Sequence, residues 1–398
     1  MSQWIEKALG EVTSYIAKGI TPKYSDNLTE NTVYVLNQKC NRNYIISYEP
    51  ARIHDLIKKK ISKEKLLKKG DVLINSTGQG TAGRVAQIWD IPYPTATDGH
   101  MITLRASQEI DKLYYGYAIK AHQNQIESLA EGSTGQTEIN RKRLLEEVVI
   151  RFPKEKDVQY KIAHILENID KKIAINKKIN RNLSEQVMAI FIDLFGDADK
   201  NATVDEVSLN VTDGVHNTVK DDPDGEFFLL SCKNIKGGSL SLGDAERRIN
   251  QETFEKLRKR TKLEKGDILL SSVGTIGELL LMSFDPDKYE FQRSVAIIKP
   301  NIDVVSSEYL YCALLAQKQE IIRAAHGAVQ QCIFISDIKG FTIHKPTAER
   351  LIQFDNAVVP MMKMIYQNEE ENRRLSSFRG ILLPKLMSGE LDVSELNI

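Results

Sequence analysis

The most regular hydrophobic pattern in this chain is a heptad seam that occurs twice, once in each half. Apolar residues and two asparagines recur in alternating steps of four and three, the spacing of a helix that packs along one face. The first seam is Ile162, Leu166, Ile169, Ile173, Asn176, Asn180, Leu183, Val187, Ile190 and Leu194. The second, 192 residues later, is Phe354, Val358, Met361, Ile365, Asn368, Asn372, Leu375, Arg379, Leu382 and Leu386. We therefore predict two long helices that pair along these seams.

Polar positions in the seams predict how the helices pair. An asparagine at an a or d position lowers stability but fixes register, and both seams hold two asparagines at matching places. Because each helix follows its own half, antiparallel pairing would place the globular parts at opposite ends. Pro360 is expected to kink the second helix or to mark its start, and Arg379, which replaces Val187, is expected to splay the pairing. Separate amphipathic helices are the alternative, which the shared spacing disfavours.

The remainder of each half repeats the same series of short segments. A Lys-Gly-Asp turn with an apolar run occupies residues 69–76 and returns at 265–272, and a Tyr-rich helix at 113–119 returns at 309–315. A period of about 190–195 residues is too long for a solenoid and indicates a duplicated domain. Alternating apolar residues predict strands, and the predicted strands are 71–75, 84–88, 100–105 and 294–299.

Together these patterns predict a mixed α/β fold. We expect two duplicated globular domains joined by two long helices, which form an antiparallel coiled coil with pseudo-two-fold symmetry. A length of 398 residues agrees with such an organisation. The expected parts are a first domain at 1–153, a central helix at 154–196, a second domain at 197–346, a C-terminal helix at 347–387 and a tail at 388–398.

Composition excludes several classes of protein. With 41% hydrophobic and 27% charged residues the chain can bury ordinary cores and is not wholly disordered. No run approaches the ~20 apolar residues of a membrane helix, and the first residues lack a signal-peptide core. We expect a cytoplasmic protein without a membrane partner. Its four cysteines are expected to be reduced thiols: Cys40, Cys232, Cys312 and Cys332.

Charge is balanced overall but unevenly distributed. Residues 1–143 carry 20 basic and 15 acidic side chains, a net of +5, and residues 196–345 carry 19 and 23, a net of −4. Nucleic-acid affinity of the second region must therefore arise from local patches rather than from its overall field.

No motif in the chain predicts catalysis. Gly78 to Gly83 satisfies Gly-x-Gly-x-x-Gly, but the pattern after it is that of a strand rather than a helix, so we interpret it as a hairpin turn. A phosphate-binding loop and metal-ligand spacings are also missing from the sequence. We expect no catalytic residues, no metal and no cofactor.

Basic stretches and polar turns at equivalent places in the two halves suit DNA binding. Lysines and arginines would contact phosphates, and polar side chains beside them would contact base edges. The candidates in the first half are Lys58, Lys59, Lys60, Ser76, Thr77, Gln79, Thr81, Arg84, Ser133, Thr134 and Gln136. Those in the second half are Arg258, Lys259, Arg260, Ser271, Ser272, Thr275, Arg293, Gln330 and Gln331. The alternative is that these residues only build turns and solvated faces.

An ordered series of short motifs carries a family resemblance over nearly the whole chain. In the first half it runs through Gly132 to Gln136, Ile139, Phe152-Pro153, Ile162 to Leu166 and Ile169-Asp170. In the second half it runs through Gly327 to Gln331, Lys345-Pro346 and the helix from Phe354. In this series the chain resembles the specificity (S) subunits of type I restriction-modification systems.

The resemblance implies a division of labour. Two target recognition domains would each recognise one half of a split, asymmetric DNA sequence, and the helices would set the gap and dock methyltransferase subunits. The implied partners are double-stranded DNA, two methyltransferase subunits and restriction/translocase subunits, and catalysis would belong to those subunits. A protein-assembly scaffold that does not bind DNA is the alternative; the acidic second half favours it and the paired basic stretches oppose it.

Overall fold

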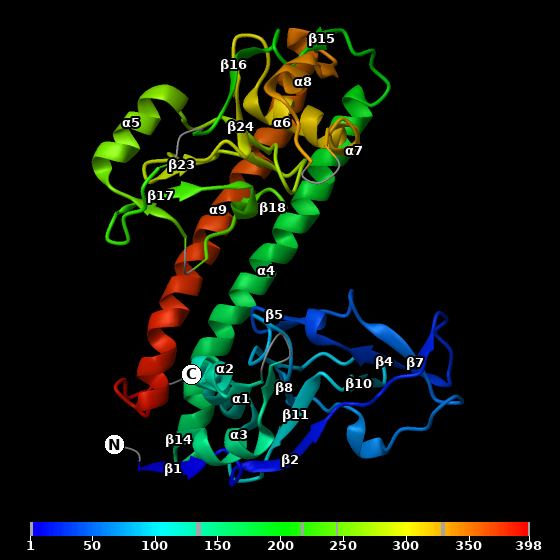
Figure 1. Ribbon diagram of the computed structural model, residues 1–398, viewed down its shortest axis with the longest axis vertical. Helices are drawn as coiled ribbons and strands as arrows, with labels where there is room; N and C mark the ends of the chain where they lie inside the picture. The colour runs from blue at the N-terminus through cyan, green and yellow to red at the C-terminus, as the bar shows by residue number, and fades with distance from the viewer. Residues whose placement is uncertain (1–2, 133–136, 216–218, 244–245, 328–330, 397–398) are drawn as a thin grey trace. The chain divides into compact units, whose positions relative to one another are not determined.

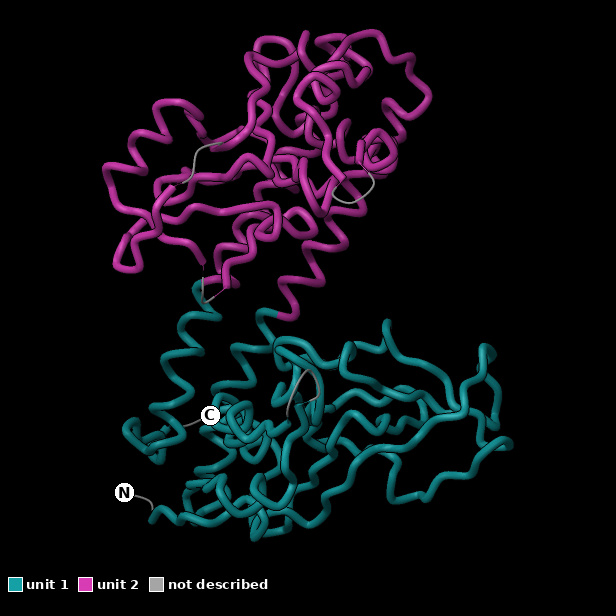
Figure 2. The backbone as a smooth tube through the Cα atoms, in the orientation of Figure 1, with its two compact units in different colours: residues 1–173, 374–398 teal, residues 174–373 magenta. Residues whose placement is uncertain are grey.

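The computed structural model describes residues 3–132, 137–215, 219–243, 246–327 and 331–396. It has the predicted mixed α/β fold, in which two β-rich parts share the order of their main elements (Figure 1). The chain forms two compact units (Figure 2). Unit 1 comprises Met1–Ile173 and Arg374–Ile398, and unit 2 comprises Ala174–Arg373. Each unit therefore contains one β-rich part and a portion of each long helix.

Unit 1 contains an antiparallel sheet and a mixed sheet. The antiparallel sheet has the order β2 (Thr13–Lys18), β11 (Met101–Ala106), β8 (Val72–Asn75), β9 (Val85–Gln87). The mixed sheet has the order β10 (Thr95–Thr97), β4 (Thr32–Leu36), β7 (Arg52–Asp55), β3 (Tyr24–Ser25). The helices are α1 (Lys112–Ala121), α2 (Gln123–Ser128) and α3 (Arg141–Glu147). The shorter elements are β1 (Trp4–Ala8) with β14 (Val149–Pro153), β5 (Asn41–Arg42) with β6 (Ile45–Ile46), β12 (Ala130–Glu131) with β13 (Glu138–Ile139), and the 3-10 helices η1 (Gln38–Cys40) and η2 (Lys63–Lys65).

Unit 2 repeats this plan. Its antiparallel sheet has the order β16 (Ser208–Asp213), β24 (Val295–Pro300), β21 (Ile268–Ser271), β22 (Leu279–Leu281). A three-stranded sheet has the order β20 (Arg248–Ile249), β17 (Phe227–Leu230), β23 (Tyr289–Phe291). The helices are α5 (Gln251–Thr261), α6 (Ser307–Ala316), α7 (Lys318–Arg323) and α8 (Ile335–Gly340). The shorter elements are β15 (Ala202–Thr203) with β25 (Thr342–Ile343), β18 (Ile235–Lys236) with β19 (Ser239–Leu240), and the 3-10 helix η3 (Cys232–Asn234).

The central strand of each antiparallel sheet separates two cores. In β8, Val72 and Ile74 belong to the core that contains the tyrosines of α1, whereas Leu73 belongs to the core beneath β4. In β21, Ile268 and Leu270 face the α6 core and Leu269 faces the opposite one. This alternation follows from the two-residue period of a strand, and it accounts for the nearly continuous apolar run after each Lys-Gly-Asp turn.

The repeated Lys-Gly-Asp turn has a structural role. The buried carboxylate of Asp71 accepts two hydrogen bonds of 2.7 Å from Nε and Nη2 of Arg105. In unit 2, Asp267 accepts a hydrogen bond of 2.8 Å from Nζ of Lys299. Burial raises the pKa of Asp267 to about 6, while the hydrogen bond from Lys299 opposes the shift. The motif thus joins each turn to the neighbouring central strand through a buried ion pair.

The two predicted long helices are α4 (Lys156–Phe195) and α9 (Ala348–Ser388). Within unit 2, Asn176 Nδ2 donates to Asn372 Oδ1 at 3.1 Å, and Asn368 Nδ2 donates to Asn180 Oδ1 at 2.8 Å. Ascending positions in α4 meet descending positions in α9, so the helices pair in antiparallel orientation. The prediction that the two helices pack on each other is confirmed.

The structure bears on two expectations for α9. The helix runs without interruption from Ala348 to Ser388, so the expectation that the exposed Pro360 marks its start is wrong, and the expected kink at Pro360 stays a prediction. Within unit 1 the guanidinium of Arg379 forms an ion pair with Asp170 of α4, and the expected splaying of the seam at Arg379 stays a prediction. Most apolar seam residues are buried, and the seam residues that are only half-buried include Leu183, Met361 and Leu375.

We expect Asn180→Leu alone to lower the free energy of unfolding by about 1–3 kcal/mol, because Asn368 then loses its acceptor in the seam. Asn180→Leu combined with Asn368→Leu should cost less than the two single changes added together, since an apolar pair leaves no unpaired amide. Urea unfolding of the wild type, both single variants and the double variant measures this coupling. Strictly additive losses would show that the two amides act independently.

Candidate nucleic-acid interface

The polar turn at residues 76–84 connects β8 to β9, and backbone hydrogen bonds fix it to the neighbouring segments. Ser76 N donates to His100 O at 2.8 Å, Ile139 N donates to Ser76 O at 2.7 Å, and Gly83 N donates to Asn75 O at 2.8 Å. Gly83 has φ +88°, and a Cβ at this position would lie 2.7 Å from the Cα of Glu127 on α2. A glycine is therefore required where the turn packs on the helix. The strand β9 that follows supports the interpretation as a hairpin turn.

Three side chains from separate segments meet above this turn. Gln38 Nε2 donates to Thr77 Oγ1 at 2.5 Å, and Thr77 Oγ1 lies 2.9 Å from His100 Nδ1. Because a hydroxyl has one proton and two lone pairs, Thr77 Oγ1 can accept from Gln38 and bond Nδ1 of His100 at the same time. His100 is exposed and presents Nε2 as a further hydrogen-bonding group. Gln38 and His100 were not among the predicted DNA-binding residues, because only the fold brings them to Thr77.

A buried carboxylate supports the His100 turn from below. Asp98 Oδ1 accepts the backbone N–H of His100 at 3.0 Å. Burial raises the pKa of Asp98, and the hydrogen bond from His100 opposes the shift. The second half has Gln292 at the corresponding place, so this support is specific to the first half.

The other predicted residues of the first half differ in burial and in their hydrogen-bond partners. Ser76 is buried, whereas Gln79 is exposed. Thr81 Oγ1 donates to Thr77 O at 3.2 Å, and Arg84 Nη2 donates to Gly80 O at 2.8 Å, so both brace the turn. Ser133, Thr134 and Gln136 lie outside the described residues.

Lys58, Lys59 and Lys60 follow β7 of the mixed sheet and are exposed. Lys58 Nζ donates to Tyr24 O and Lys59 Nζ donates to Thr21 O, each at 3.2 Å. Lys58 Nζ also lies 3.6 Å from a carboxylate oxygen of Asp55 in β7, so the contacts of Lys58 and Lys59 are with the mixed sheet and the segment before β3 rather than with the 76–84 turn. In this position they suit contacts to a nucleic-acid backbone.

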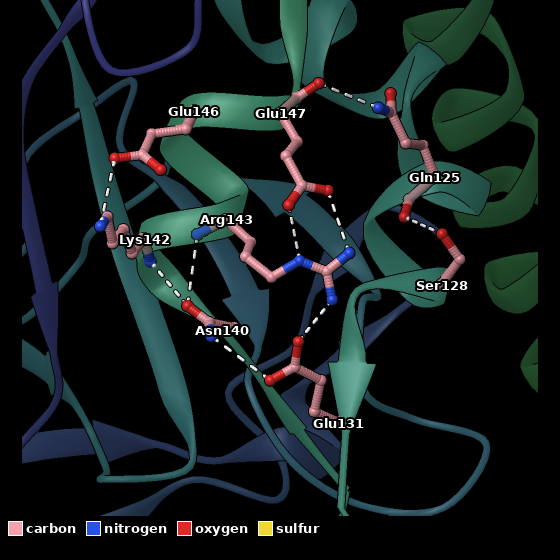
Figure 3. Close-up of polar contacts among 8 residues, drawn as sticks. All are labelled: Gln125, Ser128, Glu131, Asn140, Lys142, Arg143, Glu146 and Glu147. Carbon is pink, nitrogen blue, oxygen red and sulfur yellow. Dashed lines mark hydrogen bonds and ion pairs between the residues drawn. The ribbon is translucent and has the colours of Figure 1, made fainter.

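A surface network holds the two ends of the segment that contains Ser133 to Gln136 (Figure 3). Arg143 on α3 donates through Nε to Glu147 at 2.6 Å, and its Nη1 forms an ion pair with Glu131 of β12. Asn140 accepts the backbone N–H groups of Lys142 and Arg143 at the start of α3 and donates to Glu131 at 3.3 Å. The hydrogen bonds from Arg143 and Asn140 lower the pKa of Glu131. This network joins β12 to α3, which follows β13.

The second half has the same backbone frame with different side chains. Ser272 N donates to Ser294 O at 2.9 Å and Ile333 N donates to Ser272 O at 2.8 Å, which matches the bonds of Ser76. Cys232, Val273 and Ser294 occupy the places of Gln38, Thr77 and His100. Cys232 N donates to Ser294 Oγ at 3.1 Å. The amide and imidazole of the first half are thus replaced by a thiol and a small hydroxyl.

The predicted residues of the second half also separate into buried and exposed groups. Ser271 and Ser272 are buried, and Ser271 Oγ accepts the N–H of Glu278 at 2.8 Å. Thr275, Arg293 and Gln331 are exposed on adjoining turns. Gln330 lies outside the described residues.

The basic stretch of the second half forms α5 rather than an irregular segment. Arg258 Nε donates to the buried carboxylate of Glu290 at 2.5 Å, which gives this arginine a structural role. Arg260 pairs with Asp213 at 3.2 Å, and Lys259 is exposed. Only part of this stretch is therefore available to a nucleic-acid backbone.

The described residues of the site present hydrogen-bonding groups and charged side chains. Within the described ranges, no group of three or more His, Cys, Asp or Glu side chains could hold a metal ion. Cys40, Cys232, Cys312 and Cys332 are free thiols, as predicted. None of the helices in the part of the chain that the structure describes combines the length and apolar character of a membrane span.

The known proteins that this chain resembles in sequence and fold are specificity proteins of type I restriction-modification systems. A family model described as type I restriction modification DNA specificity domain matches residues 1–185. The type I restriction enzyme MjaIX specificity subunit of Methanocaldococcus jannaschii is 26% identical over 360 residues, covering 83% of this chain and 80% of that protein. The HindI specificity subunit of Haemophilus influenzae is 20% identical, covering 98% and 100%. The crystal structure of the type I S subunit from M. genitalium matches with a TM-score of 0.60 at 16% identity, over 97% of this chain and 96% of that one, which shows a shared fold.

Proposed function

The chain belongs to the type I restriction-modification DNA specificity subunits, and from this premise we propose that each half recognises one half of a split DNA sequence. As a specificity subunit it is a non-catalytic part of a type I complex. Membership in this family favours DNA recognition over the alternative of a scaffold that does not bind DNA.

One observation carries the proposal: the same backbone frame occurs twice with different side chains. The hydrogen bonds around Ser76 and Ser272 are equivalent, yet Gln38 and His100 of the first half are replaced by Cys232 and Ser294. Side-chain donors and acceptors distinguish base edges in the major groove, whereas backbone frames position them. Two equal frames with unequal side chains suit an asymmetric target.

The partners follow from the same proposal. Exposed lysines such as Lys58 and Lys60 contact the phosphates of double-stranded DNA in the cytoplasm. The paired helices α4 and α9 set the gap between half-sites and dock two methyltransferase subunits, with restriction/translocase subunits completing the complex. A fixed spacer converts its length into a fixed half-site separation, as dimer geometry does in repressors.

A map of modified bases in genomic DNA tests the proposal. In cells that contain the partner subunits, the wild-type gene should give methylation at one split sequence with a constant gap, and deletion of the gene should abolish it. A catalytically inactive methyltransferase subunit serves as the control for other modification systems. Methylation that is unchanged by deletion, with active partner subunits present, would contradict the proposed function.

A further inference from the structure

The turn that leads into β24 carries an arginine that the equivalent turn before β11 lacks. The two turns share equivalent backbone bonds at both ends, so their residues correspond one to one. The matching pairs are Gln292 N to Leu230 O (2.8 Å) with Asp98 N to Leu36 O (2.9 Å), and Val295 N to Gln292 O (3.0 Å) with Met101 N to Asp98 O (3.1 Å). Arg293 therefore stands where the first half has Gly99, beside Ser294 in place of His100.

The guanidinium of Arg293 is exposed on a fixed backbone. Its own N–H donates to Val215 O at 3.1 Å, and the flanking residues are held by the bonds given above. Within the described ranges its guanidinium has neither an ion pair nor a side-chain hydrogen bond. Three other arginines of unit 2 have carboxylate partners instead: Arg247 pairs with Asp221, Arg258 with Glu290 and Arg260 with Asp213. Arg293 is thus available to a ligand.

Polar residues from two other segments adjoin this arginine. Ser272 N donates to O of Ser294, the next residue after Arg293, at 2.9 Å. Gly274 N donates to Gln331 O at 3.2 Å, which brings the exposed Gln331 and Thr275 to the same turn. Arg293 therefore lies on the surface that corresponds to the Gln38, Thr77 and His100 cluster of the first half.

We infer that Arg293 recognises a guanine in the half-site bound by the second recognition domain. A guanidinium can donate two parallel hydrogen bonds to O6 and N7 of guanine in the major groove, and its rigid planar fork fits this pair of acceptors better than the flexible ammonium of lysine does. The inference rests on the proposed function and names one of its specificity-determining residues. Because the first half has Gly99 at this place, the contact belongs to one half-site only.

The comparison of the two halves favours a base over a phosphate as the ligand. Phosphates are the same along any sequence, so contacts that only position the DNA suit both copies of a duplicated frame. Arg293 is a side chain that differs between copies at equivalent positions of a turn whose ends have the same backbone bonds. Such a difference is what two unequal half-sites require.

The test compares base-modification maps of cells that carry the complete system with wild-type protein, Arg293→Ala or Arg293→Lys. Both variants should lower the preference for guanine at one position of one half-site by roughly 5- to 150-fold, equivalent to about 1–3 kcal/mol at 1.36 kcal/mol per tenfold. The other half-site should stay unchanged. Arg350→Ala, which removes an exposed arginine at the start of α9, is the charge-matched control and should leave the sequence intact.

The outcomes are distinguishable. If Arg293→Ala lowers methylation evenly at all sites while Arg293→Lys restores it, the arginine contacts a phosphate and the inference fails. An unchanged sequence preference in both variants also overturns it. A wild-type map without any split sequence would instead contradict the proposed function itself. Thermal unfolding of each purified variant and its assembly into the complex confirm that folding is retained.

Discussion

Replacing Asp71 by alanine is expected to lower the free energy of unfolding by about 3–5 kcal/mol, because it leaves the Arg105 guanidinium without its anion in a mostly buried place. Asp71 accepts both hydrogen bonds of the Arg105 fork and also the backbone N–H of Lys68 at 2.8 Å. All three donors would lose their acceptor. The only tryptophans, Trp4 and Trp89, belong to unit 1, so tryptophan fluorescence during urea unfolding reports the affected unit.

Two companion variants show whether the loss comes from the unpaired charge. Asp71→Asn keeps one acceptor oxygen and should lose less than Asp71→Ala. Asp71→Ala combined with Arg105→Met removes the charge as well as its partner, and it should recover most of the lost stability. If Asp71→Ala costs less than about 1 kcal/mol, the Lys-Gly-Asp motif does not have the structural role given to it here.

The helices and the duplication could be predicted because they depend on periodic patterns. Apolar residues at seam spacing bury one face of a helix in any context, and the matched asparagines indicated a partner. The repeat of the Lys-Gly-Asp turn was equally plain. The physical reason for this repeat could not be predicted, because Arg105 and Lys299, which pair with Asp71 and Asp267, lie 34 and 32 residues further along the chain.

The candidate interface was predicted only as far as its turns. Polar turn residues such as Ser76 and Ser272 are buried, because the backbone beside them bonds to neighbouring strands. Gln38 and His100 meet at Thr77 through tertiary contacts, and no spacing in the sequence signals that meeting. The side chains that differ between equivalent backbone positions become visible only when the two frames are compared.

Equivalent positions near the helices show the same divergence on a larger scale. In unit 1 a charged cluster combines residues of α1, α4 and α9 with one residue of a turn, and these are Tyr44, Tyr117, Lys120, Asp170 and Arg379. Their counterparts in unit 2 line a cavity of about 210 Å³, and these are Gly238, Cys312, Leu315, Met362 and Val187. Tyr44 and Gly238 both have positive φ, 61° and 79°, so the turn is kept while its side chain is lost. Charged and aromatic side chains of unit 1 thus occupy the space that is a cavity in unit 2.

The carboxylate of Asp170 holds this cluster together. It accepts the hydroxyl of Tyr117 at 2.8 Å, forms an ion pair with Arg379 and lies 3.9 Å from Nζ of Lys120. That ammonium lies 3.9 Å from the centre of the Tyr44 ring. Burial lowers the pKa of Lys120 to about 8, and the charge of Asp170 opposes the shift. Asp170 therefore offsets two partly buried cations.

We expect Asp170→Ala to lower the free energy of unfolding by about 3–5 kcal/mol at pH 7, since Lys120 and Arg379 then face each other without an anion. The pKa of Lys120 is lower in the folded protein than the ~10.4 of unfolded lysine, so its contribution to stability rises with pH between these values. Without the charge of Asp170 the pKa of Lys120 is lower still, so the pH range over which its contribution to stability rises begins at a lower pH. The difference in the free energy of unfolding between Asp170→Ala and the wild type should therefore become smaller from pH 7 to pH 9, as measured by tryptophan fluorescence in urea.

A second substitution tests whether the loss comes from Lys120. Lys120→Leu, which copies Leu315, should restore stability in the Asp170→Ala background, whereas Lys171→Leu on the exposed face of α4 should not. A loss that is independent of pH and not rescued by Lys120→Leu would show that Asp170 acts through packing alone.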